Sequence, residues 1–187
     1  MHTLVEQAQA FAQVQVYLVR GATDLFAHYG VGVQHSLGAT AAEIRGPAVM
    51  AVIGYAASTV RGALLFLTSR DVVAELQPKE LRTEAPTEEI LRDVLGEFCN
   101  MAIGRVKNQL VGHAIAPLVS TPTTIFGNDL RLPAPMSGMS AWHRFASAPG
   151  DVFVRLDAAF DPEFVLGAAG SDSSPSMPEG DMVIFAE

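Results

Sequence analysis

Three polar residues in a stretch of strong helix formers have the spacing of a site. Glu97 and Asn100 stand three residues apart, and Asp93 stands four residues before Glu97. Residues three and four apart are neighbours on one face of an α-helix. A carboxamide can accept from a water molecule while it donates to a neighbour, whereas an ionised carboxylate only accepts. The spacing therefore places one amide and two carboxylates on one helix face, either as a site or, in the plain alternative, as a solvated face.

Two glycines on the same face argue against the plain alternative. Gly96 and Gly104 flank the pair Glu97 and Asn100, and Lys107 follows on that face. A glycine inside a helix costs about 1 kcal/mol relative to alanine, so a purely solvated face gains nothing from either. A glycine without a side chain lets another backbone or a bulky partner approach closely. Tight packing of one helix on another is the second explanation.

The element that must carry these residues is a helix over 88–110. Thr87 can cap its first turn, Glu88 and Glu89 then lie at the positive end of the helix dipole, and Gly112 lies just past its end. At 100° per residue the apolar positions form one wide, core-facing stripe. The stripe consists of Leu91, Val94, Leu95, Phe98, Met101, Ala102 and Val106.

Other sites with a recognisable chemistry are not visible. The five histidines have no H-x-x-x-H or H-E-x-x-H spacing, so we expect no metal site, and His113 is expected in a turn. Cys99 has no basic neighbour that would activate it and is expected to be a packed side chain. Phosphate-binding glycine loops and the G-x-S-x-G elbow are absent from the sequence. Met136 and Met139 are expected in a loop over 127–140, where they can touch a partner.

The remaining elements predict an α+β fold. An amphipathic pattern covers 3–29 and ends at Gly30, and short apolar runs predict strands at 33–37, 47–55, 59–67, 114–120, 123–126, 142–146 and 151–158. We expect long helices on one side of an antiparallel sheet, in halves with a pseudo-two-fold relation. The domain is expected to cover 1–160, and 161–187 is expected to be a partly flexible C-terminal extension that ends in a short apolar run.

Composition limits the partners. The 187 residues carry 12 basic and 20 acidic side chains, a net charge of −8, with Lys79 and Lys107 as the two lysines. Phosphate backbones and anionic membranes are bound by clustered Lys and Arg, so a general nucleic-acid or membrane binder is not expected. One cysteine, no signal peptide and no apolar run near the ~20 residues of a membrane span favour a cytoplasmic protein.

The stretch EEILRDVLGEFCNMAIGRVKNQLVG, with VIGYAASTVRGALLFLTSRDVVAEL before it and PTTIFG after it, resembles the CheX members of the CheC/FliY/CheX family of chemotaxis phosphatases. The resemblance covers roughly residues 45–127. The family motif maps onto Asp93, Glu97, Asn100 and Pro122, with 21 residues between the last two, one fewer than usual. The equivalent positions of the first long helix, Val14 and Tyr17, lack the acid–amide pair, which is similar to the one-site CheX arrangement.

The resemblance implies an aspartyl-phosphate phosphatase that acts on a CheY-like response regulator. Asn100 would orient the attacking water, and Glu97 would anchor the active-site Lys of the regulator. Asp93, Gly96, Gly104 and Lys107 would support the contact. The chain itself would need no cofactor, because Mg²⁺ belongs to the regulator, and relatives dimerise by joining sheets, which implies a homodimer. Two alternatives stay open: a non-catalytic binding or scaffold module of the same fold in a signalling or flagellar complex, and a small-molecule sensor domain.

Overall fold

A computed structural model describes residues 4–38, 43–78, 82, 85–131, 135 and 138–167 of the chain. Three helices and seven strands lie within these residues. In chain order they are α1 (Leu4–His28), β1 (Val33–Leu37), β2 (Glu43–Ala56), β3 (Val60–Ser69), α2 (Arg70–Glu75), α3 (Glu88–Val111), β4 (Leu118–Val119), β5 (Thr123–Arg131), β6 (Met139–Ser147) and β7 (Asp151–Phe160).

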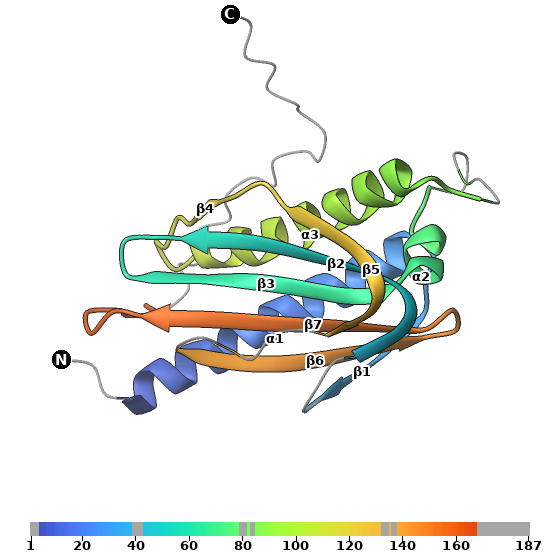
Figure 1. The fold of residues 1–187 in the computed structure, drawn as a ribbon. Coiled ribbons are helices and arrows are strands. Elements are labelled where there is room, and N and C mark those ends of the chain that lie inside the picture. The colour runs from blue at the N-terminus through green and yellow to red at the C-terminus, as the bar shows by residue number, and fades with distance from the viewer. Residues whose placement is uncertain are drawn as a thin grey trace, which may run out of the picture.

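All seven strands form one antiparallel sheet. The strand order is β1-β6-β7-β3-β2-β4, and β5 also pairs with β2 along the same edge as β4. The long helices α1 and α3 both cover one face of this sheet (Figure 1). The predicted α+β class, with long helices on one side of an antiparallel sheet, is confirmed. The two-fold relation between the halves stays a prediction.

Helix α3 begins and ends almost where the sequence predicts. The Thr87 side chain accepts a hydrogen bond from the Ile90 N–H at 3.3 Å and caps the first turn. Gly112 occupies the C-terminal cap. The helix is continuous from Glu88 to Val111, and its inner side packs into the main core. Its buried residues are Leu91, Leu95, Gly96, Phe98, Cys99, Ala102, Ile103, Val106 and Leu110.

Helix α1 lies beside α3 and crosses it closely at one glycine. A Cβ added to Gly21 would lie 3.1 Å from the Cβ of Arg105, so the bare backbone of Gly21 lets the two helices approach. Buried positions begin at Ala10, whereas Leu4 is 79% exposed. The apolar pattern of 3–29 therefore predicts the helix correctly. It is wrong in counting apolar residues before Ala10, such as Leu4, toward the core-facing stripe. Gly30, with φ of 74°, ends the helical course.

The predicted loop over 127–140 is partly wrong. Strand β5 continues to Arg131 and pairs with the first half of β2, with a register shift between Ile44 and Pro47. Met139 is the first residue of β6 and packs against the main core, because β6 pairs with β7 from that residue onward. Met136 lies outside the described residues. The turn-forming residues after Phe126 are thus accommodated in an irregular strand, where Asp129 has a φ of 53°.

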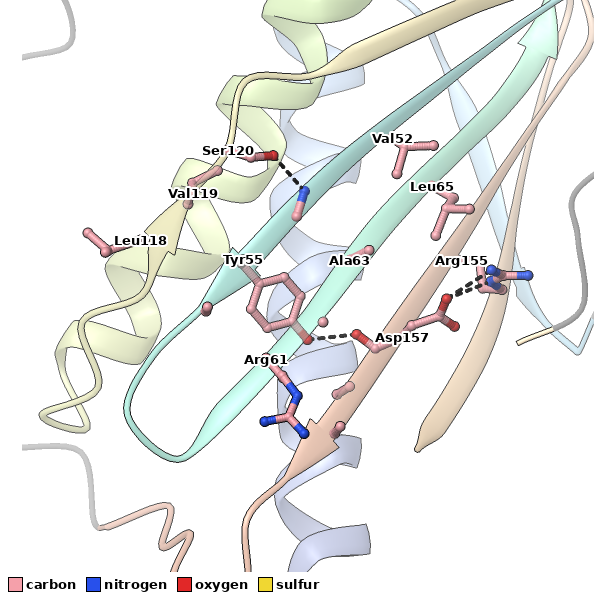
Figure 2. A pocket seen from close by; sticks show the side chains of 15 residues that line it. Val52, Tyr55, Arg61, Ala63, Leu65, Leu118, Val119, Ser120, Arg155 and Asp157 are labelled. Atoms are coloured by element: carbon pink, nitrogen blue, oxygen red, sulfur yellow. Dashed lines mark hydrogen bonds and ion pairs between the residues drawn. The ribbon is translucent and has the colours of Figure 1, made fainter. Parts of the chain in front are cut away.

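The sheet face away from the helices holds the largest groove among the described cavities, about 880 Å³ (Figure 2). Strand alternation places Val52, Leu65 and Arg155 on this face. Arg155 donates to the carboxylate of Asp157 at 2.9 and 3.0 Å and lies over the Trp142 ring at 5.3 Å. The groove is therefore separated by the whole sheet from the polar face of α3.

No helix in the described part of the chain has a stretch that is both long and apolar enough to cross a membrane.

Candidate active site

The polar residues of α3 lie together on its solvent face. Asp93, Glu97 and Asn100 are all exposed, and the helix between them has no break. One turn of α-helix rises 5.4 Å, so each side chain starts about one turn from the next. None of the three makes a side-chain hydrogen bond or ion pair with another described residue. Their polar atoms are therefore available to a partner.

The helix is held rigidly beneath these side chains. Phe98 is 1% exposed, and its ring contacts three other aromatic rings, with centroid distances of 4.8 Å to Phe26, 5.9 Å to Phe66 and 6.0 Å to Tyr29. Cys99 is fully buried beside it. Because Phe98 and Cys99 separate Glu97 from Asn100 in sequence, packing of these two fixes the direction in which the polar pair points.

Pro122 lies against the flank of α3 near the pair. A Cβ added to Gly96 would lie 3.6 Å from Cγ of Pro122, which is ordinary van der Waals contact. Gly96 is buried, whereas the sequence favoured a position open to a partner. The segment that leads into β5 covers it, so this glycine serves contact within the chain. The structure thus brings the fourth motif position, Pro122, next to the helix turn that carries Glu97.

Gly104 and Lys107 extend the same face toward the C-terminal end of α3. Apart from the local backbone of α3, no described atom comes within 4 Å of a Cβ placed on Gly104, so space over this glycine is open. Lys107 is half-buried and forms no ion pair with the described residues. The helix surface one turn beyond Asn100 is therefore open, and the approach of a partner over Gly104 stays a prediction.

Tyr29 is a neighbour of the site that the sequence analysis missed. It directly follows α1, is half-buried, and its ring packs on Phe98. Burial raises the pKa of the Tyr29 phenol, and the negative charge of Glu97 raises it further. The end of α1 therefore lies near the Glu97 carboxylate. No local pattern connects Tyr29 with residue 97, since the contact depends on how α1 packs on α3.

Cys99 and His113 take the structural roles that the sequence predicts. Complete burial raises the pKa of the Cys99 thiol, which disfavours the reactive thiolate. His113 lies in the turn after α3, where its Nε2 is 2.6 Å from the Tyr17 hydroxyl and its Nδ1 is 2.6 Å from the Gly167 carbonyl oxygen. Both ring nitrogens are thus occupied in joining α1 to the segment after β7.

Among the described residues, no three His, Cys, Asp or Glu side chains come together as a metal ion requires. The exposed face of α3 offers one amide and two carboxylates on a single helix. Such a face can bind a cationic side chain and orient a water molecule, and it does not enclose a substrate.

Comparison with solved structures shows the same fold in proteins of low sequence identity. A chemotaxis protein CheX from Desulfovibrio desulfuricans is 16% identical, with a TM-score of 0.66 over 79% of this chain and 99% of that one. The CheX–CheY–BeF3–Mg²⁺ complex from Borrelia burgdorferi is 14% identical, with a TM-score of 0.61 over 76% of this chain and 95% of that one. FliY from Thermotoga maritima is 16% identical, with a TM-score of 0.57 over 85% of this chain and 92% of that one. No curated protein matches the sequence.

The family model described as chemotaxis phosphatase CheX matches residues 49–145. The match covers more than half of the chain and includes β3, α3 and β5, as well as all four motif positions. Asp93, Glu97, Asn100 and Pro122 thus lie where α3 and the segment before β5 meet within the matched region. On this match, the chain belongs to the CheX family of chemotaxis phosphatases.

Proposed function

We propose that this chain hydrolyses the phosphoaspartate of a CheY-like response regulator. The observation that carries the proposal is the free, exposed pair Glu97 and Asn100 on a rigid helix face, with open space over Gly104. The solved complex of a CheX with CheY, BeF3 and Mg²⁺ is a structural neighbour of this chain. A helix face that cannot enclose a substrate suits a reaction whose phosphoryl group is already held by the partner.

In this proposal Asn100 orients the attacking water. Phosphoryl transfer passes through a loose transition state, so catalysis depends on placing the nucleophile in line with phosphorus more than on a strong base. The amide oxygen of Asn100 accepts from the water, and its NH₂ group donates to a neighbouring oxygen. Water then attacks phosphorus, the bond to the aspartyl oxygen breaks, and phosphate leaves the regulator. Mg²⁺ remains a cofactor of the regulator in this scheme.

In this proposal Glu97 anchors the regulator on the helix. Its carboxylate lies one turn before Asn100 and has no partner among the described residues, so it can pair with the regulator's active-site Lys. A charge-assisted contact of that kind fixes the helix in register with the phosphoryl group. Asp93 can make a second polar contact one turn earlier, and Lys107 can meet an acidic part of the regulator surface.

Single substitutions separate the two roles. We expect Asn100→Ala to slow hydrolysis at least about a hundredfold while regulator binding is retained, because an oriented water matters mainly in the transition state. Glu97→Ala should weaken both binding and rate, because its ion pair exists before the reaction. The controls are Asn108→Ala and Glu89→Ala, which remove exposed side chains of the same type from the same helix.

The measurements are the decay of phosphorylated regulator and a titration with regulator carrying BeF3 and Mg²⁺. Wild-type decay rates in both site variants would contradict the enzymatic proposal. Normal binding of the regulator without hydrolysis by the wild-type protein would instead support the scaffold alternative. A regulator substrate also implies a cytoplasmic location.

We further propose a homodimer. Within the described strands, the sheet has unpaired edges at β1 and at β4 and β5, and an edge strand can pair with a second copy about a two-fold axis. Sedimentation equilibrium over a hundredfold range of concentration tests this proposal. A mass that stays at one chain throughout would contradict it.

A further inference from the structure

A groove of about 490 Å³ runs between α1 and the edge strand β1. Most of its exposed lining is apolar, with Ala12, Val16 and Val19 on the helix side and Leu37 on the strand side. Val16 is 57% exposed and Leu37 is 66% exposed, so two large apolar side chains stand open to solvent along one groove. Neither belongs to the polar face of α3 or to its flanks.

The edge of the sheet beside this groove has hydrogen-bonding groups that no other described strand pairs with. The Gly38 N–H donates to the Trp142 carbonyl oxygen on β6 at 3.2 Å. Antiparallel strands alternate the direction of their hydrogen-bonding groups, so the N–H and C=O of His35 and Leu37 point away from β6. Strand β1 has the sequence VQHSL and lacks the Pro, Lys or other charged residues that commonly protect exposed edges. The edge can therefore accept another strand.

The charges at the groove favour an acidic occupant. Arg20 lines the groove and makes no ion pair with a described residue, and His35 lies opposite it on β1. An acidic side chain on a segment that enters the groove would satisfy Arg20. An extended segment that adds to a sheet edge gains affinity from main-chain hydrogen bonds and specificity from alternate side chains. The required sequence is thus short, apolar and flanked by carboxylates.

This chain carries such a sequence beyond the described residues. Residues 181–187 read DMVIFAE, an apolar run between two acidic residues, and no basic residue occurs from 168 to 187. β-Branched and aromatic side chains in the run suit a strand. The chain therefore supplies a segment whose apolar pattern and charge complement the groove.

The described chain ends close enough for this segment to reach. The Gly167 carbonyl oxygen is 2.6 Å from His113, which in turn contacts the Tyr17 hydroxyl on α1. Tyr17 is adjacent in sequence to Val16, so the groove lies on another side of the same helix. A Gly/Ser-rich link of the length of 168–180 spans about 20 Å on average. The diameter of a helix with its side chains is only ~10–12 Å.

We propose that residues 181–187 add as a strand to the outer edge of β1 within the same chain. Alternate apolar side chains of the segment fill the groove between Val16 and Leu37, and an acidic side chain pairs with Arg20. The intramolecular link gives the segment a high effective concentration at the groove. This occupant leaves the edge at β4 and β5 for a second copy.

Hydrogen exchange at single amides tests the proposal. In the full chain, the outward amides of His35 and Leu37 should exchange at least about tenfold more slowly than in a chain truncated after Gly180. The amides of Gln34 and Ser36 point toward β6 and serve as internal controls. Added peptide of residues 181–187 should restore slow exchange in the truncated chain. Equal exchange of the His35 and Leu37 amides in the two chains would overturn the proposal.

A point variant and a dilution series exclude other occupants. Ile184→Asp should speed exchange at His35 and Leu37 as truncation does, whereas Ser173→Asp adds the same charge outside the segment and should not. Slow exchange should be independent of protein concentration. Protection that grows with concentration and survives truncation would assign the edge to a second copy and overturn the proposal.

Discussion

Pro122 lies over the bare backbone of Gly96: a methyl group added at residue 96 would be 3.6 Å from Cγ of the proline. The contact joins the segment before β5 to the turn of α3 that carries Glu97. Gly96 and Gly104 therefore differ in their surroundings, because no described atom beyond the local backbone of α3 lies within 4 Å of a Cβ at Gly104. Gly96 faces the chain itself, and Gly104 faces open space beside Asn100.

This difference predicts that two identical substitutions differ in their effect on function. Gly104→Ala should raise the free energy of unfolding by up to about 1 kcal/mol, since alanine is the better helix former and meets no neighbour. It should also slow dephosphorylation of the regulator, because the added methyl group occupies the space through which the partner approaches Asn100. Urea denaturation and phosphoregulator decay measure the two effects.

Gly96→Ala is the matched control. The methyl group fits against Pro122 at an ordinary contact distance, so stability should be retained or rise slightly. Because Gly96 is buried, the regulator cannot touch it, and the decay rate should stay near wild type. A slower decay for Gly96→Ala than for Gly104→Ala would contradict the approach of the regulator over Gly104.

Local sequence patterns predict α3 well because its determinants are local. The Thr87 cap, the apolar stripe and the polar positions of Glu97 and Asn100 all follow from spacing along one helix. The proximity of Pro122 to Gly96 and of Tyr29 to Glu97 could not be predicted in this way, since each joins separate elements. The same reason explains the wrong boundary after Phe126: pairing with β2 extends β5 through residues that form turns in isolation.

Gly62 should tolerate no side chain. A Cβ at this position of β3 would clash with the Asp157 carbonyl oxygen and would lie 2.5 Å from the Tyr55 hydroxyl oxygen. The backbone of β7 cannot move without breaking its pairing with β3. We expect Gly62→Ala to lower the free energy of unfolding by about 2–3 kcal/mol or more. Chemical denaturation monitored by circular dichroism measures the loss.

Gly54→Ala on the neighbouring strand β2 is the control for Gly62. A Cβ there would lie 3.5 Å from the Ser120 hydroxyl oxygen, which is ordinary contact. Its effect on stability should therefore be small. Equal losses for the two variants would show that glycine in these strands is needed for a reason other than the contact of Gly62 with Tyr55 and β7.

The proximity of Tyr29 to Glu97 can be measured without a regulator. Removal of the carboxylate charge by Glu97→Gln should lower the pKa of the Tyr29 phenol, because the negative charge disfavours the phenolate. Burial remains, so the pKa should still lie above the ordinary tyrosine value. NMR titration of ring-labelled tyrosine gives the value for each ring. The control Glu89→Gln removes a carboxylate at the start of the same helix, and a shift of equal size there would contradict the assignment.

His143 should make the stability of the fold depend on pH. It is 1% exposed, its Nδ1 lies 3.0 Å from Nε2 of His35, and its Nε2 has no hydrogen-bond partner among the described residues. Burial and the neighbouring His35 lower the pKa of His143 from 6.5 to about 4, and burial also lowers the pKa of His35. The folded state thus holds His143 neutral, while the unfolded chain binds a proton below about pH 6.5.

Stability should therefore be complete above pH 6.5 and should fall as the pH drops from 6.5 toward 4, by up to about 3 kcal/mol from His143 alone. Urea denaturation at half-unit pH steps measures the slope. Replacement of the imidazole by a ring that does not titrate, in His143→Phe, should flatten most of the dependence over this interval. His28→Gln, which removes an exposed histidine at the end of α1, should leave the dependence of stability on pH unchanged. A slope that persists unchanged in His143→Phe would assign the proton uptake to other groups.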